Sequence, residues 1–333
     1  MSLEHILTKV RFTFLLSLIV AFIIGFFETL AGVFGISAAQ IPFILINYFP
    51  FFEKTYFADR ISSISYEPPF LAIYLITVCG WMFSYIITHK DKGVVRLVPS
   101  FLVLFLTYFS GSRTALIVIL IQFLFFLLIT VKKEVLINYA QKSFLVIGVL
   151  ITGLFIFNGD KIIKSVETKI ESLDFLGNLN DNVSNKSRLG IQYASLKVFS
   201  SNPIIGVGFG QQSYYNRYHY PGWATKNNYE FTLYYKNPAE PSFPPGYNLY
   251  ARLLAETGII GIGFLFFLIY YSFKRAFLIF TSETNAKKIL ALILLVSFIG
   301  LYINWLQIDT FRIYGVWLSL AILIRLTNES RNE

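Results

Sequence analysis

The polar side chains best placed for chemistry lie in one short segment that runs into an apolar stretch. This segment, "PPGYNLYARLLAETGIIGIGF" (residues 244–264), contains Tyr247, Asn248, Arg252 and Glu256. Arg252 and Glu256 are four positions apart, so on a helix they are neighbours and can form an ion pair. The plainest role of this pair is an interfacial salt bridge. The alternative is that all four side chains bind a substrate at the mouth of a membrane helix.

Three arginines are candidates for binding an anion, namely Arg60, Arg113 and Arg188. A guanidinium group donates two parallel hydrogen bonds to phosphate oxygens. Arg113 belongs to "SGSRT" (110–114), which separates two apolar stretches that are each short for a full crossing. We therefore expect this turn to lie below the bilayer surface, where ionisable groups usually mark a substrate path. The simpler interpretations are a snorkelling arginine at a helix end and, for Arg60, a plain surface charge.

Three side chains are candidates for a general base. Glu67 stands directly before Pro68 and Pro69, which suit the first turn of a helix. Its carboxylate either stabilises the helix dipole or faces a cavity as a base. Glu256 is the second candidate and His219 the third. The chain has one cysteine and three histidines, and their spacing predicts no metal site.

The long polar region before residue 247 combines glycines with aromatic residues. In "SNPIIGVGFGQQ" (201–212) three glycines alternate, yet no surrounding motif supports a nucleotide-binding loop. We expect a tight turn with exposed backbone instead. Residues 209–247 carry 12 aromatic side chains. They suit an interfacial belt or a local core, and equally the contact of flat rings with sugars.

Composition assigns the chain to the membrane proteins. Of its 333 residues, 55% are hydrophobic and 14% are charged, and the mean hydropathy is +0.60. Soluble domains carry about 25% charged residues. The net charge of +9 comes mostly from basic residues at the ends of apolar runs. That placement indicates membrane topology and argues against nucleic acid as a partner.

The apolar runs predict an all-α polytopic protein with about eight transmembrane helices. The expected spans are listed here: 12–34, 69–88, two within 97–131 divided by "SGSRT", 143–158, 258–273, 289–308 and 313–326. The positive-inside rule then predicts cytoplasmic termini and one long extracytoplasmic loop. We expect three parts: transmembrane helices in 1–158, the loop domain in 159–246, and C-terminal helices with a cytoplasmic tail in 247–333.

Four stretches resemble the O-antigen polymerase and ligase family of bacterial membrane glycosyltransferases. They are "R…EPPFLA" (60–72), "SGSRTAL" (110–116), "SRLGIQYASLKVFSSNPIIGVGFG" (187–210) and "YNLYARLLAETGIIGIG" (247–263). The resemblance implies a GT-C-like, metal-independent and cofactor-free inverting enzyme in the cytoplasmic (inner) membrane. Its donor would be a glycan on undecaprenyl diphosphate, held outside the membrane by the three arginines. A flippase and a chain-length regulator would be its partners, besides the lipid bilayer.

One residue departs from the pattern of the family's ligases. Ligases carry His-Asn, nine residues and then Gly-x-x-Gly, with the histidine as the proposed base. Here Asn248, Gly258 and Gly261 keep the spacing, but Tyr247 replaces the histidine. A phenol with a pKa of about 10 is a poor base at neutral pH. We therefore favour a polymerase of repeat units over a ligase, with a glycan transporter and a non-catalytic assembly partner as further alternatives.

Overall fold

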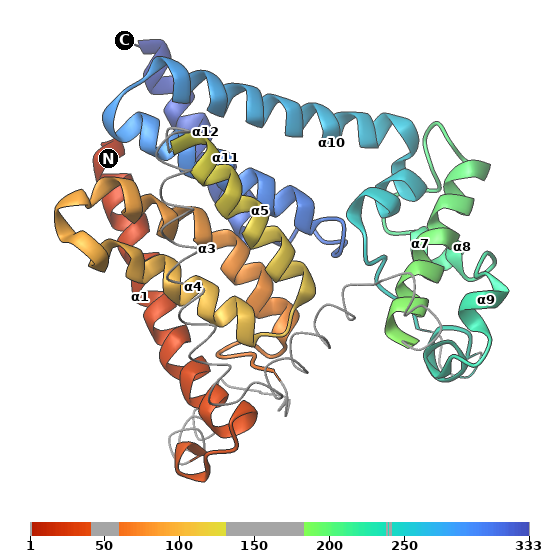
Figure 1. Ribbon diagram of the computed structural model, residues 1–333. Helices are drawn as coiled ribbons and strands as arrows, with labels where there is room; N and C mark the ends of the chain where they lie inside the picture. Colours follow the sequence, from red (N-terminus) through yellow and green to blue (C-terminus); the bar gives the residue numbers. More distant parts are fainter. Residues whose placement is uncertain (1, 41–59, 131–182, 238, 240–241, 333) are drawn as a thin grey trace. The chain divides into compact units, whose positions relative to one another are not determined.

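The computed structural model describes residues 2–40, 60–130, 183–237, 239 and 242–332. Within these ranges the regular structure is helical and no strand occurs, which confirms the all-α prediction (Figure 1). The chain divides into two compact units. The first unit holds the described residues up to Thr130, together with Leu268–Asn304 and the residues from Arg312 onward. The second unit holds residues 183–267 and Trp305–Phe311.

Six helices of the described residues are long and apolar enough to cross a membrane. They are Leu3–Val33, Pro68–Thr88, Lys90–Phe109, Arg113–Thr130, Leu249–Ser282 and Asn285–Asn304. The predicted span 143–158 lies outside the described residues. The predicted span 313–326 falls within helix α12 (Tyr314–Asn332), which is not among the six. The number of eight therefore stays a prediction.

The predicted break inside residues 97–131 is confirmed. Helix α4 (Val98–Phe109) ends before Ser110, and helix α5 begins at Arg113 and runs to Thr130. Gly111 between them has a φ of 64°, a left-handed conformation that glycine adopts without steric cost. The turn therefore separates two short helices, as the sequence indicated.

The core of the first unit is formed where α5 packs against α3 (Pro68–Thr88) and α11 (Asn285–Asn304). Gln122 of α5 is fully buried there, and its Nε2 donates to the carbonyl of Ile76 at 3.2 Å and to that of Val296 at 2.9 Å. A Cβ at Gly300 would overlap the Gln122 amide. Small residues and interhelical amide bonds are typical means of joining helices in membranes.

The second unit is built from short helices around a small aromatic core. Helix α7 (Val183–Ser201) is followed by α8 (Gln212–Asn216), α9 (Gly222–Thr225) and the π-helical turn η5 (Phe231–Tyr235). Tyr220 and Phe231 are buried against residues of α7 and α9. Part of the aromatic content of 209–247 is thus local core, whereas Tyr218 and Trp223 are exposed.

Helix α10 (Leu249–Ser282) begins in the second unit and is interrupted once. Gly258 has φ 61° and ψ −159°, outside the helical range. Residues 249–257 therefore form a short helix of their own. The predicted span 258–273 begins at this interruption, which confirms the predicted change from a polar helix to an apolar one.

Candidate functional site

Asn248 caps the short helix that opens α10. Its Oδ1 accepts a hydrogen bond from the Ala251 backbone N–H at 3.1 Å, which satisfies one of the free donors of the first turn. Its Nδ2 donates to Oε1 of Gln192 on α7 at 3.4 Å. The Gln192 amide in turn donates to the Tyr247 carbonyl at 3.4 Å. One glutamine thus holds both residues of the Tyr-Asn pair.

Tyr247 lies under the guanidinium of Arg188. The Arg188 Cζ is 5.0 Å from the centre of the Tyr247 ring, within the range of a cation–π interaction. Tyr247 has a φ of 53°, which is uncommon for a bulky residue and is often found at functional positions. Burial and a hydrogen bond to Tyr247 raise the pKa of Tyr235, so that phenol is neutral at physiological pH. Arg188, Tyr247 and Asn248 are therefore neighbours in the second unit.

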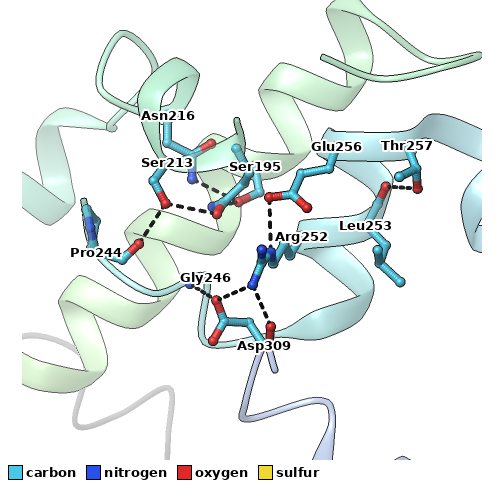
Figure 2. A network of polar contacts seen from close by, with 11 residues as sticks. Ser195, Ser213, Asn216, Pro244, Gly246, Arg252, Leu253, Glu256, Thr257 and Asp309 are labelled. Carbon is cyan, nitrogen blue, oxygen red and sulfur yellow. Dashed lines mark hydrogen bonds and ion pairs between the residues drawn. The ribbon is translucent and has the colours of Figure 1, made fainter. Parts of the chain in front are cut away.

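The predicted ion pair between Arg252 and Glu256 is present. The Arg252 Nε is 3.0 Å from Oε1 of Glu256, whose side chain is only 2% exposed. Figure 2 shows that the same guanidinium also reaches Asp309, donating to its carbonyl at 2.9 Å. The Asp309 carboxylate lies 3.7 Å from the Arg252 Nη1 and accepts the Gly246 N–H. Arg252 is thus held between two carboxylates, which offset its charge.

The glycine-rich segment pairs with the interruption in α10. The N–H groups of Val207 and Gly208 donate to the carbonyls of Ala255 and Glu256, at 3.0 and 2.9 Å. On the other side of the interruption, the Ile259 N–H donates to the Pro203 carbonyl at 2.8 Å.

Two glycines allow this close approach, because a Cβ at Gly206 or Gly258 would overlap the opposite backbone. The expected tight turn is confirmed, and its role is to satisfy the ends of a broken helix.

In the first unit, Arg60 packs on the turn that precedes Arg113. The Ile61 N–H donates to the Phe109 carbonyl at 3.0 Å, which ties residue 61 to the end of α4. A Cβ at Gly111 would lie 3.0 Å from the Cβ of Arg60. Arg60 therefore lies beside the turn from which the helix of Arg113 starts.

Glu28 supports this turn and was not singled out by the sequence. Its carboxylate, 4% exposed, accepts the N–H groups of Ser62 and Ser63 at 3.1 and 2.7 Å. Glu28 could have been identified from the sequence, because it is a carboxylate inside the first apolar run and ionisable residues in a span are rare and usually functional. Asp309 was likewise missed as the partner of Arg252, since 57 residues separate the two.

The two remaining candidates are Glu67 and His219. Within the part of the chain that the structure describes, neither side chain is hydrogen-bonded to the other candidate residues. Glu67 occupies the N-cap position of α3 with extended backbone, and its side chain makes no capping bond. His219 is half-buried in the second unit, where its backbone N–H donates to Asn216. Arg60, Glu67 and Arg113 thus belong to the first unit, and the other six candidates belong to the second. Among the described residues, no group of three histidine, cysteine or acidic side chains is placed to hold a metal ion.

Comparison with models of protein families gives a match. The family model of O-antigen ligases matches residues 98–267, which extend from α4 through the Arg113 turn and α7 to the interrupted helix α10. Comparison with curated proteins gives no match. Members of the matched family are glycosyl-transferring enzymes. The match covers half of the chain and includes three of the four stretches that carried the resemblance, so this membrane protein belongs to the O-antigen ligase family.

Proposed function

We propose that the protein is a polymerase of oligosaccharide repeat units linked to undecaprenyl diphosphate. It transfers the growing glycan from its lipid diphosphate to a sugar hydroxyl of the next unit. The reaction takes place at the extracytoplasmic side of the bacterial inner membrane. Membership in a family of glycosyl-transferring enzymes and the apolar helices support a lipid-linked substrate.

The observation that carries the choice of polymerase is Tyr247 at the position of the ligase histidine. Asn248 and the two glycines keep the family spacing, and Gln192 holds the Tyr-Asn pair in place. A neutral phenol hydrogen-bonds a sugar hydroxyl but does not remove its proton at neutral pH. Tyr247 therefore orients a sugar. The guanidinium of Arg188 lies over the Tyr247 ring and places a positive charge beside it.

The transfer itself is a single displacement with inversion. The acceptor hydroxyl oxygen bonds to the anomeric carbon, the bond from that carbon to the diphosphate oxygen breaks, and the electron pair leaves with the diphosphate. Arg60 and Arg113 bind the leaving diphosphate and stabilise its developing charge. Glu67 is the base to which we assign the hydroxyl proton, since Glu256 is buried and already paired with Arg252.

The test uses the purified protein in nanodiscs with lipid-linked repeat units as the sole substrate. A polymerase makes a ladder of products without another acceptor, and Arg113→Ala abolishes the ladder. Arg325→Ala, which removes an arginine that is half exposed on α12, is the matched control and keeps it. A full ladder from folded Arg113→Ala protein would refute the assignment.

A ligase is the second candidate, because the matching family model is that of O-antigen ligases. The spacing of Asn248, Gly258 and Gly261, which resembles that of the family's ligases, favours it as well. A ligase yields no ladder from repeat units alone and gives product only when a separate lipid or protein acceptor is added. The same assay therefore separates the two activities.

A further inference from the structure

Two isoleucines in the glycine-rich segment are unusually exposed. Ile204 and Ile205 follow α7 and are 63% and 71% exposed. They lie in the part of the sequence expected to form a water-facing loop. Adjacent branched apolar side chains on such a loop need an explanation, because contiguous apolar surface on a protein usually marks an interaction site.

The backbone ties these isoleucines to the first turn of a membrane helix. Hydrogen bonds run from the Ile259 N–H to the Pro203 carbonyl at 2.8 Å and from the Ile260 N–H to the Ile204 carbonyl at 3.4 Å. From residue 259 onward α10 is apolar and belongs to a candidate span. Ile204 therefore lies at the same depth as the start of that span.

The side chains of this first turn are exposed on the protein in the same way. Ile259 is 62% exposed and Ile260 is 50% exposed. For a helix that crosses a membrane, such side chains face acyl chains. Ile204 and Ile205 extend this lipid-facing surface onto the neighbouring loop.

Several polar backbone groups of the loop are also paired within the protein. Polar backbone groups in hydrocarbon must be paired within the protein. The Gly206 N–H donates to the Asn202 carbonyl at 3.1 Å, and the Val207 and Gly208 N–H groups donate to α10. Residue 203 is proline and has no N–H to satisfy. The segment thus pairs part of its polar backbone with the protein and exposes the side chains of Ile204 and Ile205.

We propose that residues 202–208 form a re-entrant hairpin whose Ile204 and Ile205 side chains insert into the acyl-chain region of the outer leaflet. The partner is the lipid bilayer itself. The hairpin anchors the second unit to the membrane surface beside α10. This inference does not depend on which glycan the protein transfers.

The test places an environment-sensitive probe at each isoleucine. Cys79 is the sole cysteine and is buried, so Cys79→Ala gives a cysteine-free background. Ile204→Cys and Ile205→Cys are labelled with a nitrobenzoxadiazole dye in liposomes, and Lys226→Cys, an exposed position of the second unit, is the matched control. We expect blue-shifted emission at 204 and 205, with quenching by doxyl-labelled phospholipids and several-fold weaker quenching by aqueous iodide than at 226.

Equal iodide quenching at all three positions would overturn the proposal. A second measurement uses the unaltered protein, in case a substitution disturbs folding. A phospholipid with a diazirine in its acyl chain is photolysed in the liposomes, and the labelled peptides are identified by mass spectrometry. The peptide containing residues 202–208 becomes labelled if the hairpin is inserted, and its absence among otherwise labelled α10 peptides contradicts insertion.

Discussion

Tyr250 and Phe266 stack with their ring centres 5.9 Å apart and their planes 15° from parallel, although both belong to α10. Sixteen residues of straight helix would separate them by about 24 Å, at about 1.5 Å per residue. The chain therefore folds back sharply at Gly258, whose φ of 61° allows the reversal. The polar helix 249–257 is thus placed against the beginning of the apolar one instead of extending it.

Replacement of Gly258 by alanine should destabilise the protein strongly. The Cβ would be strained at positive φ and would overlap the Ile204 carbonyl. Strain of this kind costs about 1–3 kcal/mol before the overlap is counted. Gly263→Ala is the control, since a Cβ there meets nothing within 4 Å. Fluorescence-detected gel filtration after heating measures the melting midpoints of the Gly258→Ala and Gly263→Ala variants. Equal midpoints would argue against a required reversal of the chain at Gly258.

Removal of Arg252 should be far more harmful than removal of a similar arginine on the surface. Arg252→Ala leaves the Glu256 carboxylate buried without its ion pair, at a cost of about 3–5 kcal/mol. Arg325 and Glu329 form an Arg–Glu pair of identical spacing on α12, half exposed at the arginine. Arg325→Ala should cost at most about 1 kcal/mol. Adding Glu256→Gln to Arg252→Ala should restore part of the lost stability, and no recovery would mean that the buried charge is not the cause.

Two substitutions of Tyr247 separate its ring from its hydroxyl. Tyr247→Phe keeps the contact with Arg188 and should lower kcat/KM by about 3- to 10-fold, the value of one hydrogen bond. Tyr247→His introduces a group that titrates near pH 6.5. We expect it to make transfer to an added acceptor rise with pH between about 6 and 7.5, as deprotonation creates a base. A flat profile in this variant would show that residue 247 does not approach the acceptor.

Glu28 should be needed in its charged form. A glutamine there has one acceptor oxygen for the N–H groups of Ser62 and Ser63, so one buried donor faces an amide NH₂ group. The expected loss of stability is about 1–3 kcal/mol. Because residue 61 is bonded to the end of α4, the Arg60–Arg113 turn should loosen and diphosphate binding should weaken. Glu4→Gln, at the exposed start of α1 (Leu3–Glu28), is the control.

The aromatic core of the second unit should make the protein sensitive to alkali. Burial raises the pKa of Tyr220 and of Tyr235, so the folded state holds both phenolic protons more tightly than the unfolded state. This contribution to stability is complete below a pH of about 10, the unfolded pKa, and is lost as the pH rises further. The melting midpoint should fall above that pH, and less so in Tyr235→Phe. Tyr229→Phe, which removes an exposed phenol, should leave the profile unchanged.

Features that depend on neighbouring residues could be predicted from the sequence. The Arg252–Glu256 pair, the break before Arg113 and the start of the apolar helix at Gly258 all follow from local spacing and backbone chemistry. Partners far apart in sequence could not be predicted. Asp309 reaches Arg252 and Glu28 reaches Ser63 only after folding, and no helical or strand period connects such positions. For the same reason the sequence identified the arginines as candidates but not the glutamine that holds Tyr247 and Asn248.

The amide of Gln122 has a consequence for how the protein is made. Its bond to Ile76 joins α5 to a helix that the ribosome has already delivered, whereas Val296 lies 174 residues further along. At about 5–20 residues per second, that second partner is synthesised about 9–35 s later. The contacts between α3 and α5, which include this bond and the packing of Phe83 against Phe123 and Phe126, need only residues that are synthesised early. The second bond of Gln122 and the space that Gly300 leaves for its amide depend on α11, which is synthesised late.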